Sequence, residues 1–299
     1  KDNVENPDVT GALPYQLVDV AHWQQGLLQT HAFDRRIGFW KTYLRGTLEH
    51  LRIPADRNPG ASLEAISTAL KVGSEAMAGL KAACARWKTD LRGVFITAYA
   101  TVLSRHYRQR ELIIQTPIQG RLANTANLIA PCSEATLVRV RVPRKTSFRD
   151  MASANDSTFH QAIEHDIPLS LLHDALGHDA SLREHLSWAV LSIQEPPKEQ
   201  VEELRSFKSE VFQNIATSSL TGDRLPLHSH SIMDLKMNEK DELEGNWRCK
   251  AALMNQRELD ALAIRFQRIL EAVSQSTREG PSLEDTIEMR VIKDESPVS

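Results

Sequence analysis

The sequence predicts an α/β protein, because segments with strand periodicity alternate along it with segments of helical periodicity. Residues 136–142, TLVRVRV, give the clearest strand signal, since Leu137 and two arginines occupy one side and three valines occupy the other. Residues 91–108 carry apolar side chains at helical spacing. Residues 256–274 present one continuous apolar face, as expected of an amphipathic helix that covers a sheet.

The first third of the chain predicts helices followed by a strand and a further helix. Residues 15–46 carry aromatic and aliphatic anchors at intervals that favour mainly helical structure, and residues 54–59 are bounded by prolines and predict a loop. Residues 65–72 alternate between polar and apolar side chains and predict a strand. Ser74 is a suitable N-cap for a helix that continues to about Trp87.

The remaining elements are predicted from the same local signals. The apolar run 112–114 predicts a buried strand that leads into a shaped loop, because Pro117 cannot donate to a sheet ladder and Gly120 permits unusual backbone angles. Ser147 would cap a helix to about residue 164, and Pro168 would open a short helix to Leu176. Strands are expected at 187–193, 231–237 and 244–253. The pair Asn255 and Glu258 forms a capping box that starts the last helix.

Composition excludes several classes of function. A net charge of -3 gives no electrostatic reason to expect nucleic acid or an acidic membrane as a partner. No apolar run is long enough to span a bilayer, and the first residues show no signal-peptide pattern, although the chain opens at Lys1 without a methionine. The 3 cysteines are widely spaced and odd in number, which argues against a disulfide framework and predicts a reducing, cytoplasmic location.

The chain divides into one large unit with two polar ends. Residues 1–14 are polar and contain proline and glycine, which predicts a linker or the end of a preceding lobe. Residues 15–277 would form the folded unit, and residues 278–299 a polar tail or linker. Residues 194–224 combine a double proline with a charged run, and we expect a long surface connection that in part crosses to a neighbouring lobe.

Short motifs resemble, in order and spacing, those of the condensation domains of nonribosomal peptide synthetases. TPIQGR at 116–121 is similar to the family's TPVAGR, VDVAHW at 18–23 to its YADYAVW, and LRIPAD at 51–56 to its LxLPTD. Further along, IAPCSEATLVRV at 129–140 stands where the family has IGFFVNTLVLRV, and HDIPL at 165–169 matches its HQDxPF. FW at 39–40 with Leu44 resembles YWxxxL, HDAS at 178–181 resembles RDxS, and MDL at 233–235 resembles FDL. The match covers roughly residues 15–275.

The resemblance implies the C-terminal lobe of a chloramphenicol-acetyltransferase-like, CoA-dependent-acyltransferase fold, with a mixed sheet flanked by helices. It implies a domain that joins a carrier-bound acyl or peptidyl thioester to an amine or hydroxyl acceptor. The implied partners are the N-terminal lobe and the donor and acceptor carrier proteins, with no bound cofactor because phosphopantetheine arrives on those carriers. The channel residues implied by the motif positions are Thr116, Gln119, Gly120, Arg121, Ser133 and Glu134.

Two departures leave a second function open. The family's catalytic HHxxxDG belongs to the N-terminal lobe, and we expect that this chain begins too late to contain it, so no catalytic residue is assigned here. Residues 131–135, PCSEA, replace the family's FFVNT and put a carboxylate at Glu134. The alternative is therefore a non-catalytic platform that docks a carrier protein or a tailoring enzyme. A free-standing acyltransferase on CoA substrates would need a histidine base, and no suitable one is located.

The other candidate residues are interpreted as structural. His228 and His230 could share one side of a strand and suit a metal, but no complete ligand set accompanies them, so no metal is predicted. His165 and Asp166 are interpreted as a helix-end contact. Arg121 could bind a phosphate or the pantetheine arm, and the alternative is an ion pair that pins its loop. Arg139 and Arg141 are interpreted as a solvated or ion-paired sheet face, and the Trp87 and Trp188 side chains as core.

Overall fold

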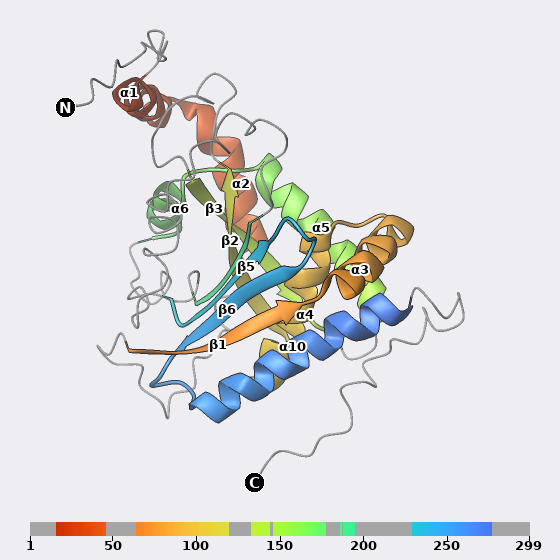
Figure 1. Ribbon diagram of the computed structural model, residues 1–299. Helices are drawn as coiled ribbons and strands as arrows, with labels where there is room; N and C mark the ends of the chain where they lie inside the picture. Colours follow the sequence, from red (N-terminus) through yellow and green to blue (C-terminus); the bar gives the residue numbers. More distant parts are fainter. Residues whose placement is uncertain are drawn as a thin grey trace, which may run out of the picture.

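The protein folds around one mixed sheet, as the computed structural model shows (Figure 1). The structure describes residues 16–45, 64–119, 133–143, 146–177, 186, 188–194 and 229–276. Within them the helices are α1 (Leu17–Leu28), the 3-10 turn η1 (His31–Phe33), α2 (Asp34–Tyr43), α3 (Ser74–Trp87), α4 (Leu91–His106), α5 (Phe148–Glu164), α6 (Leu169–Leu176) and α10 (Gln256–Ser276). The strands are β1 (Ala65–Val72), β2 (Glu111–Gln119), β3 (Ser133–Arg141), β4 (Ala189–Gln194), β5 (Ser231–Met237) and β6 (Leu243–Lys250).

The described strands pair in the order β1-β6-β5-β4-β2-β3. β4 pairs in parallel with both β2 and β5, whereas β1 with β6, β5 with β6, and β2 with β3 pair antiparallel. The parallel pairs require crossover connections, and helices supply the first of them between β2 and β4. The α/β class and the mixed sheet flanked by helices are therefore confirmed.

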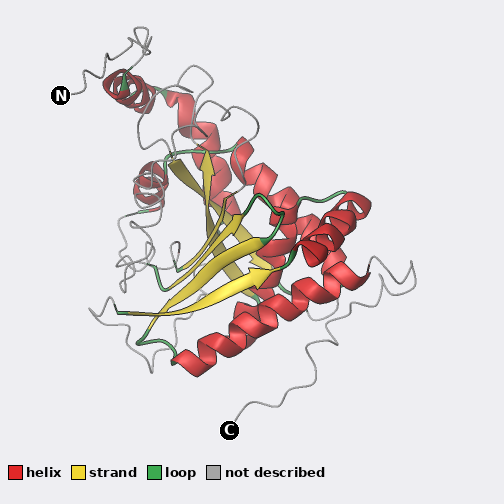
Figure 2. Cartoon of the chain, viewed as in Figure 1, coloured by secondary structure: helices red, strands yellow, loops and turns green. Residues whose placement is uncertain are grey.

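Helices α3, α4, α5 and α10 gather along one side of the sheet (Figure 2). The core lies between them and the strands. Trp247 of β6 is fully buried and packs edge-on against Tyr99 of α4 at 5.3 Å and Phe266 of α10 at 6.5 Å between ring centroids. Trp87 and Trp188 are also buried, so their interpretation as core is confirmed. Burial of such aromatic surface is a leading source of stability for the layer.

Two of the predicted helix starts are confirmed by their capping hydrogen bonds. The side chain of Ser147 accepts a hydrogen bond from the amide of Asp150 at 3.0 Å, which caps α5. The Asn255 side chain accepts from the Glu258 amide at 2.9 Å, while the Glu258 carboxylate accepts from the Asn255 amide at 2.8 Å. This reciprocal pair is the predicted capping box. Strand β1 and helix α3 occupy the predicted residues, but Ser74 is the first helical residue and not the N-cap. Gly73 takes the N-cap position and no side chain caps the helix, so the predicted Ser74 cap is wrong.

The predicted end of β2 is wrong. The strand does not stop at Thr116 but continues through Pro117 to Gln119, and β3 begins earlier than expected, at Ser133. The ladder with β4 involves only Ile114 and Gln115, so beyond them β2 has its ladder partner on the β3 side. A proline is tolerated at such a one-sided position. β6 likewise ends at Lys250 rather than at residue 253.

The polar ends and the predicted long connection at 194–224 lie outside the described residues, apart from Gln194, and the domain boundaries stay predictions. Of the described helices, none combines the length and apolar character that a bilayer crossing requires. Cys84 and Cys249 are buried free thiols, and burial raises the pKa of each to about 12.

Gly245 of β6 permits close pairing with β5, and its substitution tests how much this close pairing contributes to stability. A Cβ at this position would lie 2.0 Å from the carbonyl oxygen of Asp234, so the strands must separate to admit it. We expect Gly245→Ala to lower the free energy of unfolding by about 1–3 kcal/mol, measured by urea denaturation. The control is Gly38→Ala in α2, where a Cβ meets nothing within 4 Å and should be neutral or slightly stabilising. Equal stability of the two variants would contradict this account of the β5–β6 pair.

Candidate functional site at the ends of strands β2 and β3

The predicted site residues fall where β2 ends and β3 begins, beside α2 and α6 (Figure 1). The antiparallel register places Thr116 opposite Thr136 and Ile118 opposite Glu134. Alternate residues of a strand share one side, so Glu134 and the two threonines lie on the same face. His165 and Asp166 follow the end of α5, and Asp166 lies near enough to Glu134 for the Glu134 charge to affect its pKa.

The structure places some predicted channel residues and leaves others outside its described part. Thr116 is fully buried, and within the described residues its hydroxyl has no hydrogen-bond partner. Glu134 is half-buried. Gln119 pairs with Ser133 at the last rung of the ladder, but their side chains are not described. Gly120 and Arg121 lie outside the described residues, together with the rest of 120–132. The channel-facing role of the set stays a prediction.

Helix α2 holds the chain that follows α5 in a fixed position. The indole Nε1 of Trp40 donates to the carbonyl oxygen of His165 at 2.8 Å. Phe39 stacks on the His165 ring, with centroids 3.9 Å apart. Arg36 donates to the carbonyl oxygen of Asp166 at 2.9 Å. The interpretation of His165 and Asp166 as a helix-end contact is confirmed, and α2 is the element that they contact.

Asp166 is electrostatically coupled to Glu134. Burial is the main cause that raises the pKa of Asp166 from 3.8 to about 6, and the negative charge of Glu134 raises it further. The Arg36 charge and the Ile167 amide act in the opposite direction without cancelling these effects. A carboxyl group with a pKa of about 6 exchanges protons close to neutral pH, so Asp166 can accept a proton or a hydrogen bond from a neighbouring amine.

The Asp166 pKa gives a pH-dependent stability that can be tested. Because the folded state holds this proton more tightly than the unfolded chain, its stabilising contribution is complete below pH 3.8 and is lost as pH rises through about 6. Asp166→Asn should therefore gain stability relative to the parent between pH 4 and 7, by about 1 kcal/mol after allowance for partial solvent exposure. Urea denaturation across this range measures the gain. The exposed Glu239→Gln is the control, and a gain that does not grow with pH would contradict the raised pKa.

Sequence reasoning missed the Glu134–Asp166 pair and the part played by Arg36. Both carboxylates stand in motifs, but the residues are far apart along the chain and no local pattern joins them. Their approach depends on how α5 ends and on how α2 packs over that end. No local sequence signal would have predicted it.

The neighbouring charged and polar residues have structural partners. Arg139 bonds to Glu111, and Arg141 approaches the same carboxylate at 3.0 Å, so their interpretation as an ion-paired sheet face is confirmed. Arg139 also donates to the carbonyl oxygen of Tyr43 at 2.6 Å, which fixes the end of α2 on the edge strand. His230 is completely buried, whereas His228 lies outside the described residues.

A second polar pair lies between β5 and β6. Arg248 donates to the carboxylate of Asp234 at 3.0 Å, and both side chains are largely buried. Asp234 stands in the MDL segment, and the Ser192 side chain of β4 also hydrogen-bonds it. The Asp234 carboxylate therefore links β4, β5 and β6 through its two side-chain partners, which indicates a structural role.

A mixed sheet of this order, flanked by helices and carrying these motifs, is the combination expected of a condensation-domain fold. Residues 5–290 match the family model described as Condensation domain. The chain belongs to the condensation domain family.

Curated relatives and solved structures agree with this assignment. The chain is 28% identical over 176 residues to a linear gramicidin synthase of Brevibacillus parabrevis, a match that covers 58% of this chain and 4% of that protein. It is 24% identical over 268 residues to gramicidin S synthase 2 of Brevibacillus brevis, a match that covers 87% of this chain and 6% of that protein. The chain thus spans a small fraction of the length of these curated relatives.

Solved structures share the fold at lower identity. The X-domain from teicoplanin biosynthesis superposes with a TM-score of 0.72 at 21% identity, over 90% of this chain and 62% of that one. The first condensation domain of the CDA synthetase superposes with a TM-score of 0.64 at 16% identity, over 88% of this chain and 55% of that one. These likenesses establish the architecture, and the family match supplies the class.

Proposed function

We propose that this chain is the C-terminal lobe of a condensation domain in a nonribosomal peptide synthetase or a hybrid assembly line. The single observation that carries the proposal is the family match across residues 5–290. The absence of an HHxxxDG sequence within the 299 residues supports the choice of the C-terminal lobe. In a two-lobed condensation domain, a lobe that has this sheet and these motifs but lacks the HHxxxDG histidine would form one wall of the substrate channel.

The proposed reaction is acyl transfer. The amine or hydroxyl of the acceptor attacks the thioester carbonyl of the donor, a new amide or ester bond forms, and the carbon–sulfur bond breaks. The departing phosphopantetheine thiolate takes up a proton, and the base that removes the acceptor's proton would be the histidine of the N-terminal lobe. Phosphopantetheine enters on the donor and acceptor carrier proteins, and this lobe would contribute surface, orientation and charge.

Glu134 is the residue proposed to tune the acceptor side of this channel. It stands where the family's motif has an amide, it is half-buried, and it lies close enough to Asp166 to affect that group's pKa. A negative charge there would hold a protonated amine or accept its hydrogen bond before attack. Gln119, Gly120, Arg121 and Ser133 are proposed to line the same surface, and the buried Thr116 to support the strand beneath it.

The test adds an N-terminal lobe, which would form the other wall of the substrate channel. An N-terminal lobe with an intact HHxxxDG is mixed with or fused to this chain, loaded donor and acceptor carrier proteins are added, and product is measured by mass spectrometry. Product should form only with both lobes present, and Glu134→Ala should lower the rate by about tenfold or more. The exposed Glu239→Ala is the matched control. Equal rates for the two variants would remove Glu134 from the site, and no product from any lobe tested would count against the catalytic assignment.

A non-catalytic docking platform is the second candidate. The segment 131–135, which departs from the family's motif at the channel, favours it. One solved structure with a TM-score of 0.68 and 21% identity is titled a complex of the X-domain and OxyB from teicoplanin biosynthesis, so a domain of this fold can carry a docked partner. A degraded HHxxxDG in the sequence encoded before Lys1 would favour the platform, and an intact one would favour the enzyme.

A further inference from the structure

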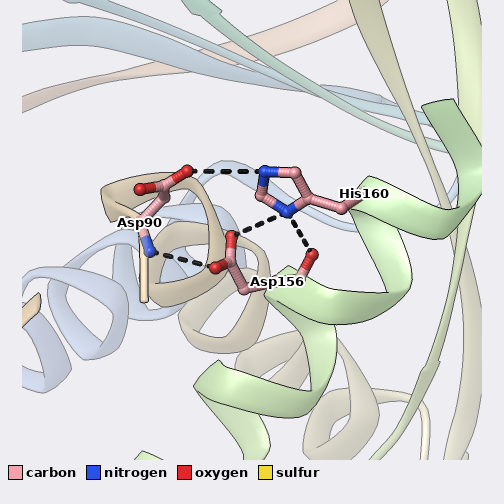
Figure 3. Close-up of side chains that lie close together, drawn as sticks. All are labelled: Asp90, Asp156 and His160. Atoms are coloured by element: carbon pink, nitrogen blue, oxygen red, sulfur yellow. Dashed lines mark hydrogen bonds and ion pairs between the residues drawn. The ribbon is translucent and has the colours of Figure 1, made fainter. Parts of the chain in front are cut away.

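Three ligand-type side chains meet where the N-terminus of α4 lies against α5 (Figure 3). Asp90 precedes α4, and Asp156 and His160 lie one turn apart on α5. The Nε2 atom of His160 lies 3.7 Å from Oδ2 of Asp90, and its Nδ1 atom lies 3.7 Å from Oδ1 of Asp156. One ligand atom from each of the three residues lies within 4.8 Å of the others.

Close packing of the two helices creates this meeting point. A Cβ on Gly93 would lie 2.7 Å from the Cβ of Asp156 and 2.8 Å from the carbonyl oxygen of Ala152, so only glycine permits the observed approach. The approach brings the amide of Asp90 to 3.1 Å from Oδ2 of Asp156. One carboxylate oxygen of Asp156 is thus committed to the start of α4, and the other faces the cluster.

The second carboxylate oxygen of Asp156, Oδ1, has no hydrogen bond within the described part of the chain, although the residue is largely buried. Asp156 is 9% exposed, and among the described residues its Oδ1 has no hydrogen-bond partner. Its nearest ring nitrogen, Nδ1 of His160, is 3.7 Å away and already has a closer partner, the carbonyl oxygen of Asp156, at 2.8 Å. The Asp156 side chain is 12% exposed, and a largely buried carboxylate oxygen without a hydrogen bond is costly, a cost that a bound cation would relieve.

His160 is oriented as a metal ligand would be. Its Nδ1 can only donate to the carbonyl oxygen of Asp156, so the neutral ring carries its lone pair on Nε2, which faces Asp90. Histidine ligands in metal sites are commonly oriented through such a bond from the other ring nitrogen. The Asp90 and His160 side chains are 71% and 58% exposed, so both can move the roughly 1 Å that coordination at about 2.0–2.2 Å requires.

We propose that Asp90, Asp156 and His160 bind one divalent transition-metal ion of the zinc type, with water completing its coordination. Imidazole nitrogen with two carboxylates suits zinc or cobalt, whereas calcium and magnesium prefer oxygen ligands throughout. The ion would join the start of α4 to the middle of α5. This site is independent of the β2–β3 strand ends and does not rest on the proposed function.

The test uses the chelator-treated 299-residue protein with Zn²⁺ in titration calorimetry and Co²⁺ in visible absorption. We expect saturable binding of one ion per chain and a rise in Tm on addition of Zn²⁺. Asp90→Asn and His160→Gln should each weaken the affinity by at least about tenfold. His31→Gln is the matched control, because His31 forms an exposed pair with Asp34 at 2.7 Å and should leave the affinity unchanged.

The outcomes separate metal binding from a simple ion-paired cluster. Circular dichroism and urea denaturation check that the Asp90→Asn and His160→Gln variants are folded. Both side chains are exposed, so we expect both variants to fold. Loss of affinity in these two variants alone confirms the site. Absence of saturable binding up to millimolar Zn²⁺, or equal affinity in all variants, would overturn the proposal and leave the three residues as a polar contact between α4 and α5.

Discussion

A polypeptide consisting of these 299 residues is expected to give no condensation product when it is incubated with loaded donor and acceptor carrier proteins. The sequence contains no HHxxxDG, so no histidine base of that motif is present. The proposed C-terminal lobe would also supply only one wall of the channel. Holding two reactants in attack geometry contributes about 7–11 kcal/mol in favourable cases, and loss of that contribution alone slows the reaction by about five to eight orders of magnitude.

The measurement is product formation by mass spectrometry against a control that contains buffer and both carriers. A positive control adds a lobe with an intact HHxxxDG, which distinguishes an inactive lobe from unloaded carriers. Product above the buffer control from the 299 residues alone would contradict the two-wall account. It would also require a base among the histidines of this chain, which the described site does not supply.

Trp40→Ala should be the most damaging single substitution near the candidate site, at about 3–5 kcal/mol of unfolding free energy. Trp40 is 1% exposed and packs edge-on against Phe39 and Tyr43, each at 5.4 Å between centroids. Its removal leaves a large cavity beside α2 and deprives the carbonyl oxygen of His165 of its donor. The residues after α5 would then lose their main anchor.

Two further tryptophan variants serve as controls, and urea denaturation measures the free energy of unfolding of all three. Trp40→Phe keeps most of the packing but loses the indole donor, so its cost should be clearly smaller than that of the alanine variant. Trp23→Ala removes a side chain that is 50% exposed and should change stability by no more than about 0.5 kcal/mol. Similar costs for Trp40→Ala and Trp23→Ala would refute the anchoring role.

The sequence by itself determined the order and type of the elements. Ser147 and the Asn255–Glu258 box predicted helix starts correctly, because a cap is a contact between residues three positions apart. The alternation in 136–142 predicted a strand, and its arginines were correctly placed on an ion-paired side. Family motifs along the chain predicted the class that the match over residues 5–290 then established.

Only the tertiary structure decided which residues meet. Periodicity says which side of an element is apolar, but it does not say which elements face one another. The extension of β2 past Pro117 depends on where the β4 ladder stops. The approach of Glu134 to Asp166 depends on α2 closing over the end of α5. The meeting of Asp90 with His160 depends on how closely two helices pack. Each of these contacts joins distant segments, and packing of the whole core sets their separation.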